Sequence, residues 1–119
     1  ISLLTDLKDF KASGCRGLEN ITYLEPLTQL IKLELVGQYV PLNDITPLST
    51  HTNLTYLRLS LNNVKDYSSL SSSIKLKYLE LIPDSINNLD FLQTLTQLQS
   101  LYIQNAYKGI NDINGLTAL

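Results

Sequence analysis

Residue types that carry chemistry are scarce in this sequence of 119 residues, which has one cysteine, one histidine, no methionine and no tryptophan. A single cysteine excludes a disulfide bond within the chain. Without a cluster of Cys and His residues, a structural zinc site lacks its ligands. We therefore expect no metal site of this kind and no disulfide framework.

Concentrated positive charge and long apolar runs are also missing. Nine Lys and Arg residues are scattered among eleven Asp and Glu residues, and the net charge is −2. Nucleic-acid binding asks for a concentrated basic surface, so we expect no nucleic-acid partner. No apolar run approaches the roughly 20 residues of a membrane span, so we expect no membrane insertion by this segment.

A repeated pattern of leucines is what the chain does contain. Residues 54–62 follow the frame L-x-x-L-x-L-x-x-N, and its second leucine position recurs at residues 10, 33, 57, 79 and 101, in steps of 23, 24, 22 and 22 residues. A period of this length with this consensus is typical of leucine-rich repeats. The other copies of the frame are Leu30, Leu33, Leu35 and Gln38, then Leu76, Leu79, Leu81 and Asp84, then Leu98, Leu101, Ile103 and Ala106, and more loosely Leu7, Phe10, Ala12 and Cys15.

Each repeat predicts a short strand followed by a return path. Leu57 and Leu59 alternate with Arg58, which is the pattern of a half-buried strand. Because each strand begins again after one turn, successive strands must run parallel, with right-handed crossovers. In the returns a leucine-like residue recurs at every third position, which suits 3₁₀ turns or irregular structure better than an α-helix. One such series is Ile86, Leu89, Leu92, Leu95 and Leu98.

These patterns predict an α/β-type solenoid, a right-handed leucine-rich-repeat superhelix with a parallel β-sheet on its concave face and 3₁₀ or irregular segments on its convex face. We expect residues 1–119 to form one array of about five coils. Both ends of the chain fall inside a repeat and no cap is visible, so we expect a fragment of a longer array. Two coils carry a two-residue insertion after the strand, around residues 38–42 and 106–110, which is either part of a binding rim or neutral variation.

The returns NDITPL (residues 43–48) and TNLTYL (residues 52–57) give the chain a family resemblance. It resembles the internalins, surface proteins of Gram-positive bacteria whose leucine-rich repeats bind host receptors. The same repeat class resembles the leucine-rich regulatory subunit of protein phosphatase 1, an intracellular scaffold. The resemblance implies a non-catalytic protein-binding module, for surface recognition or adhesion at the cell surface or after secretion. The alternative is a cytoplasmic scaffold or regulatory subunit of a larger assembly.

The few reactive side chains fit structural roles better than catalysis. Cys15 falls in the Asn position of the frame, where a buried thiol is an accepted variant. His51 replaces a leucine of the return path, and we expect a half-buried surface histidine. Asp44 and Asp112 occupy equivalent N-D-I segments and are expected to cap turns through Asx hydrogen bonds. No enzyme signature and no cofactor-binding pattern is present, so we do not expect an enzyme.

The outward positions of the strands form the candidate binding surface. Tyr and Arg are enriched at the energetic centres of protein interfaces, and three tyrosines and an arginine fall on adjacent coils here. The alternative is a ladder of cross-strand charge pairs, and both can hold at once. We therefore predict another protein as the partner, without its identity. The predicted contact residues are Tyr56, Arg58, Tyr78, Glu80 and Tyr102, together with Glu34, Val36 and Ile82.

Overall fold

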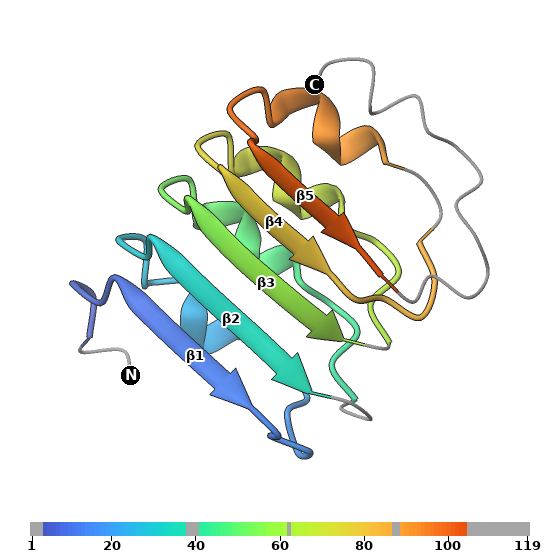
Figure 1. Cartoon of the computed structure of the whole chain (residues 1–119). Coiled ribbons are helices and arrows are strands. Elements are labelled where there is room, and N and C mark those ends of the chain that lie inside the picture. The colour runs from blue at the N-terminus through green and yellow to red at the C-terminus, as the bar shows by residue number, and fades with distance from the viewer. Residues whose placement is uncertain (1–3, 38–40, 62, 87–88, 105–119) are drawn as a thin grey trace.

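The computed structural model describes residues 4–37, 41–61, 63–86 and 89–104. Within those residues, short strands alternate with short 3₁₀ helices (Figure 1). The strands are β1 (Asp9–Ser13), β2 (Lys32–Gly37), β3 (Tyr56–Leu61), β4 (Tyr78–Leu81) and β5 (Ser100–Ile103). The 3₁₀ helices between them are η1 (Thr22–Leu24), η2 (Thr46–Thr50), η3 (Ser68–Ser72) and η4 (Asp90–Thr94). No helix among the described residues is long and apolar enough to span a membrane.

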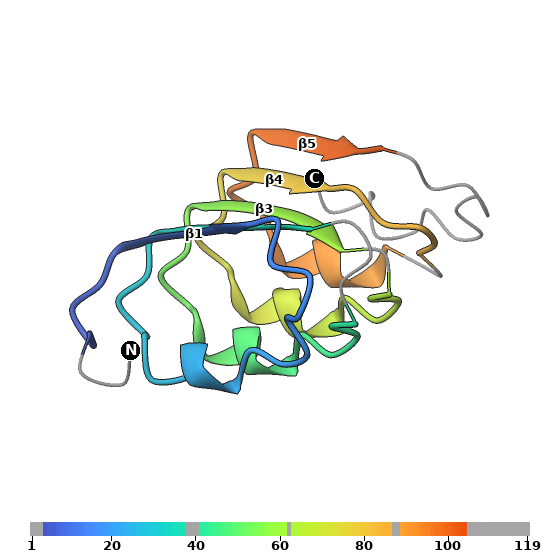
Figure 2. The same cartoon turned by 90° about the horizontal axis from the view of Figure 1, so that it is seen from below.

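The strands form one parallel sheet in the order of the chain, β1-β2-β3-β4-β5. Its register places equivalent residues of each frame side by side, so that Leu57 of β3 lies between Leu33 of β2 and Leu79 of β4. The described 3₁₀ helices all lie on one side of this sheet, and the opposite side carries none of them (Figure 2). We call the uncovered side the strand face. The predicted parallel strands are thereby confirmed.

The returns are 3₁₀ turns, as the three-residue period predicts. The N–H of Leu48 donates to the carbonyl of Ile45, and the N–H of His51 donates to the carbonyl of Leu48. Side chains three residues apart eclipse one another in a 3₁₀ helix, so a leucine at every third position keeps one face apolar. Pro47 fits the first turn of η2 because the missing N–H would have no partner there.

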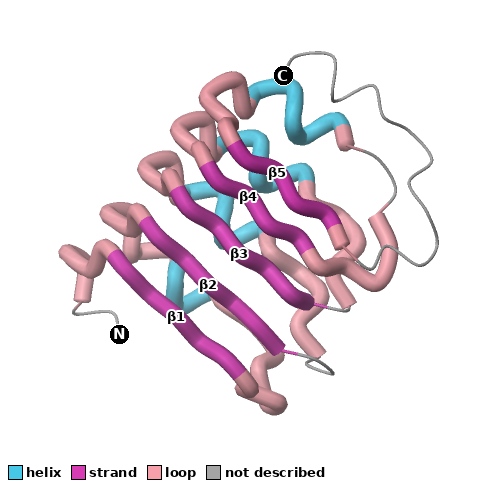
Figure 3. The backbone as a smooth tube through the Cα atoms, in the orientation of Figure 1, coloured by secondary structure: helices cyan, strands magenta, loops and turns pink. Residues whose placement is uncertain are grey.

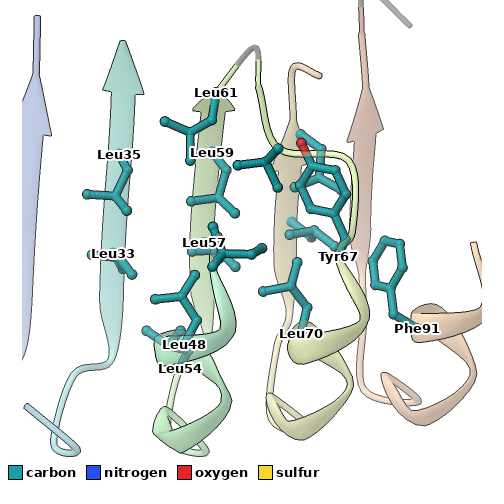
Figure 4. Packing of buried hydrophobic residues seen from close by; sticks show 14 of the residues in the cluster. Leu33, Leu35, Leu48, Leu54, Leu57, Leu59, Leu61, Tyr67, Leu70 and Phe91 are labelled. Atoms are coloured by element: carbon teal, nitrogen blue, oxygen red, sulfur yellow. The ribbon is translucent and has the colours of Figure 1, made fainter. Parts of the chain in front are cut away.

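The core is a layer of mostly aliphatic side chains, with Tyr67 and Phe91, between the sheet and the 3₁₀ turns (Figure 4). Leu57 and Leu59 point into it from β3 and are fully buried, while Leu48 and Leu70 meet them from the returns and are fully buried too. One face of the sheet therefore packs against the 3₁₀ returns, and the strand face remains available for contact with another molecule.

Polar side chains tie neighbouring returns together. The hydroxyl of Ser73 donates to the carbonyl of His51 at 3.1 Å, and that of Thr94 donates to the carbonyl of Ser71 at 2.6 Å. His51 is fully buried, and its Nε2 lies 2.8 Å from the carbonyl oxygen of Leu24. A carbonyl can only accept, so Nε2 carries the proton, and Nδ1 is left without a hydrogen-bond partner.

Two expectations from the sequence are wrong. His51 is buried rather than half-exposed, because it takes the inward position that Leu27 and Leu95 fill in other coils. Cys15 is exposed rather than buried. Cys15 shares this exposure with its whole coil, since every described residue of 4–20 is exposed or half-buried. Gly14, directly before it, has a φ of 68°, a backbone conformation that favours glycine.

Other sequence expectations meet the structure only in part. Asp44 caps its turn as predicted, since its Oδ1 accepts a hydrogen bond from the N–H of Thr46 at 2.9 Å. Asp112, the insertion around residues 106–110 and most of the Asn positions of the frame lie outside the described residues. Of the insertion around residues 38–42, only residues 41 and 42 are described.

Candidate protein-binding surface

The strand face carries the alternate side chains of β1–β5, and the repeat fixes which of them are neighbours. Register pairs Lys32 with Tyr56, Tyr56 with Tyr78, and Tyr78 with Ser100. One step further along the strands, Arg58 pairs with Glu80, and Glu80 pairs with Tyr102. All these positions follow from the frame, because the leucines between them must face the core. Figure 3 shows the strands side by side in this order.

Aromatic rings form a continuous row across the strand face. The rings of Tyr56 and Tyr78 are stacked, with centroids 4.4 Å apart and planes only 3° from parallel. The ring of Tyr102 contacts that of Tyr78 at 5.6 Å with a tilt of 41°. Ser100, the register partner of Tyr78, is small, and this leaves room for Tyr102 to lean across. At the other end, Nζ of Lys32 lies 4.7 Å from the ring centroid of Tyr56, within cation–π range.

Glu80 holds two members of this surface in place. Its carboxylate forms an ion pair with Arg58 and accepts a hydrogen bond of 2.8 Å from the hydroxyl of Tyr78. These bonds stabilise the charged carboxylate, chiefly the one from Arg58, and lower the pKa of Glu80. The same bond keeps the proton on Tyr78 and raises its pKa to about 12. Neither group is therefore suited to act as a base or nucleophile near neutral pH.

A second charge cluster lies beside the aromatic row. The carboxylate of Glu34 in β2 forms ion pairs with Nζ of Lys11 in β1 at 3.4 Å and with Nζ of Lys32 in its own strand at 3.8 Å. The outward charges of β1–β4 balance, because Lys11, Lys32 and Arg58 face Asp9, Glu34 and Glu80. The strand face is thus polar and aromatic but electrically neutral, and among the described residues all of these charges except Asp9 form ion pairs.

The predicted site residues separate into two groups in the structure. Ring contacts, an ion pair and a hydrogen bond connect Tyr56, Arg58, Tyr78, Glu80 and Tyr102 into one group. Tyr102 is the most exposed of the five residues, at 48%. We call these five residues the tyrosine cluster. The other predicted contacts, Glu34, Val36 and Ile82, lie outside it.

The other three predicted residues offer a partner less contact surface than the tyrosine cluster does. Glu34 is only 6% exposed, so its main effect is to hold the two lysines. Val36 and Ile82 are half-buried and flank Ser60 near the ends of their strands. Lys32 was missed as a site residue, although its register position opposite Tyr56 was a usable signal.

No group of three or more potential metal-ligating side chains gathers among the described residues. No protein-family model and no curated protein sequence matches the chain. Two solved structures from Listeria monocytogenes do resemble it. Internalin C2 matches with a TM-score of 0.77 and 30% sequence identity over 86% of this chain and 43% of its own. Internalin InlF matches with a TM-score of 0.85 and 28% identity over 99% of this chain and 33% of its own. The chain therefore spans less than half the length of either structure.

Proposed function

We propose that this chain, a leucine-rich-repeat protein of the 22-residue class that resembles the internalins, is a non-catalytic protein-binding module whose strand face receives the partner. A solenoid of this kind supports protein interaction in general, since it presents an extended, regular surface and little enclosed volume. The finer part of the proposal is the place of contact. The tyrosine cluster is the centre we assign to it.

The observation that carries the assignment is the order already present in the tyrosine cluster. Tyr78 is held on one side by stacking on Tyr56 and at its hydroxyl by Glu80. A partner that covers these rings has few side-chain rotors to freeze, and the entropic cost of binding is correspondingly small. Large rings that are rigid before binding are typical of interface centres.

Surface recognition of internalin type is the setting we propose, in preference to an intracellular scaffold. Both matching structures reported above are internalins, and the similarity covers 86% and 99% of this chain. The partner we expect is a protein with an apolar or aromatic patch, because the strand face is neutral and Lys11, Lys32 and Arg58 are all in ion pairs.

The test compares variants of the strand face with variants of the opposite side. After a partner is identified by affinity capture and mass spectrometry, its binding is measured by calorimetry. Tyr78→Ala should weaken binding by about 2 kcal/mol, or roughly thirtyfold, without unfolding the chain. Tyr78→Phe keeps the ring and loses only the bond to Glu80, so it should weaken binding far less.

The matched control is Gln93→Ala in η4, an exposed residue on the side away from the strand face. This change should leave affinity unaltered. If Gln93→Ala weakens binding while Tyr78→Ala has no effect, the partner contacts the 3₁₀ side and the assignment is wrong.

A further inference from the structure

A pocket of about 350 Å³ lies outside the tyrosine cluster, at the edge of the sheet where the strands begin. The turns that lead into β1, β2, β3 and β4 each contribute to it, and Figure 3 shows these turns as a row of loops at one end of the strands. We call it the strand-start pocket. It is lined by Lys8, Gln29, Ile31, Asn53, Thr55 and Lys75.

The charge of this pocket differs from that of the strand face. Two of its lining residues are lysines and none is acidic. Within the described residues, neither Lys8 nor Lys75 forms an ion pair, whereas Lys11, Lys32 and Arg58 each do. Asp6 and Asp9 flank Lys8 along the chain but do not line the pocket. The pocket therefore combines two lysines that no described acid pairs with.

The neutral side chain of Asn53 holds Lys75 in position in the pocket and leaves its charge available to a ligand with oxygen atoms. Asn53 is fixed, since its Nδ2 donates to the carbonyl of Thr28 at 3.1 Å and its Oδ1 accepts from Nζ of Lys75 at the same distance. An ammonium group has three hydrogens to donate, so Lys75 is held by Asn53 and keeps donors for a ligand. This arrangement positions a cation without neutralising it.

The pocket also has an apolar part, which narrows the kind of anion it suits. Ile31 is 41% exposed although it is a large aliphatic residue. A glutamate or aspartate side chain combines a carboxylate for the lysines with methylene groups for Ile31. A free inorganic anion would use the lysines alone. Only two lysines line the pocket, which is far from the continuous basic surface that nucleic acid requires.

We propose that the strand-start pocket binds carboxylate side chains of an acidic segment in the partner protein. This proposal rests on the proposed function in one respect, namely that the partner is a protein. The pocket borders the sheet whose strand face carries the tyrosine cluster, so one partner can present an apolar patch to the tyrosines and an acidic segment to the lysines. The pocket would then fix the orientation of the partner along the strands.

The experiment uses the full chain labelled with ¹⁵N and a blocked hexaglutamate peptide as the probe, at low ionic strength. Chemical-shift changes should concentrate at the backbone amides of Ile31 and Thr55 and at the side-chain amide of Asn53. Hexaglutamine is the uncharged control peptide and should cause none of these changes. Lys8→Gln and Lys75→Gln should each weaken hexaglutamate binding by about threefold to fivefold, as expected for an exposed charge pair.

Lys65→Gln is the matched control variant. It removes the same charge from an exposed position between β3 and η3, at the opposite end of the strands, and should leave binding unchanged. Equal weakening by Lys65→Gln, or equal binding of hexaglutamine, would overturn the proposal.

Two further measurements distinguish this proposal from a site for free anions and from the proposed role of the tyrosine cluster. Inorganic phosphate and acetate are titrated alone, and a stronger response to phosphate at the same amides would show a free-anion site and overturn the choice of a carboxylate segment. Tyr78→Ala should leave hexaglutamate binding intact. The pocket and the tyrosine cluster can therefore fail independently, because one is tested with the peptide and the other with the partner.

Discussion

Replacing the buried His51 by leucine should stabilise the protein and remove part of its sensitivity to acid. The substitution is compatible with the fold because Leu27 and Leu95 already occupy the equivalent position in other coils. It removes the hydrogen bond from Nε2 to the carbonyl of Leu24, which has a length of 2.8 Å. That carbonyl keeps a second partner, the N–H of Leu27 at 2.9 Å, so the change leaves no buried acceptor without a bond.

The magnitude follows from three effects. Loss of one neutral hydrogen bond costs about 1 kcal/mol, whereas removal of the unpartnered Nδ1 recovers about 1–3 kcal/mol. The leucine also adds apolar surface to a fully buried position. We expect a net gain of about 1 kcal/mol in the free energy of unfolding at about pH 8, or roughly 3–5 °C in Tm for a chain of this size.

The dependence on pH has a definite sign. Burial disfavours the imidazolium and lowers the pKa of His51 below its ordinary value of 6.5. As the pH falls through 6.5, the unfolded chain therefore takes up a proton that the folded chain does not, and stability decreases. His51→Leu abolishes this contribution, so its advantage over the natural sequence should grow from about pH 8 to about pH 5.5.

The assay is urea unfolding followed by circular dichroism for both proteins at the two pH values. Carboxylates that titrate at lower pH, such as Glu80, are common to both proteins and cancel in the difference. The reasoning is refuted if His51→Leu is less stable at about pH 8, or if the difference between the two proteins does not change with pH. His51→Ala is the matched variant that leaves a cavity, and it should destabilise the protein at both pH values.

Two other predictions concern the core and the strand face. Leu57→Ala should lower the free energy of unfolding by about 2–5 kcal/mol in the same urea experiment, because the side chain is fully buried at the centre of the sheet; an unchanged midpoint would contradict the register. Glu80→Gln should bring the pKa of Tyr78 down from about 12 towards its ordinary value of 10.0, since the carboxylate holds the proton on the hydroxyl. Tyrosinate absorbance measured against pH detects this change, with Tyr78→Phe identifying the signal, and an unaltered titration would exclude the bond.

The leucine frame was sufficient to predict the architecture, because a fixed period determines which residues lie side by side. The adjacency of Tyr56 and Tyr78 and the pairing of Arg58 with Glu80 follow from counting residues between frames. The 3₁₀ returns follow in the same way from leucines at every third position. In a solenoid each coil repeats the geometry of the last, so sequence spacing translates directly into spatial neighbours.

The leucine frame does not predict side-chain conformations. The parallel stacking of Tyr56 on Tyr78 and the bond from Tyr78 to Glu80 depend on rotamers, which the frame leaves open. Counting residues pairs Glu34 with Lys11 and Arg58 across the strands, but Glu34 forms ion pairs with Lys11 and with Lys32 of its own strand. The strand-start pocket depends on the volumes of side chains from four separate turns, and no single motif encodes it.

His51 and Cys15 show two different causes of error. For His51 the position in the repeat outweighs the polarity of the side chain, since Leu27 and Leu95 fill the same buried position in other coils. For Cys15 the position in the repeat misled, because none of the described residues of 4–20 is buried, and even the inward Leu7, Phe10 and Leu18 are only half-buried.

The hydrogen bonds of the sheet run along the axis on which the coils are stacked, since each strand pairs only with the strands before and after it. A force pulling the first and last coils apart would therefore load the junctions between coils in series, so that every junction carries the same tension and the weakest opens first. The hydroxyls of Ser73 and Thr94, each bonded to the carbonyl of a preceding return, lie across such junctions and reinforce them on the side opposite the sheet. The force that the chain withstands is therefore set by its weakest junction between coils. Its extension under a given force is the sum of the extensions of all the junctions.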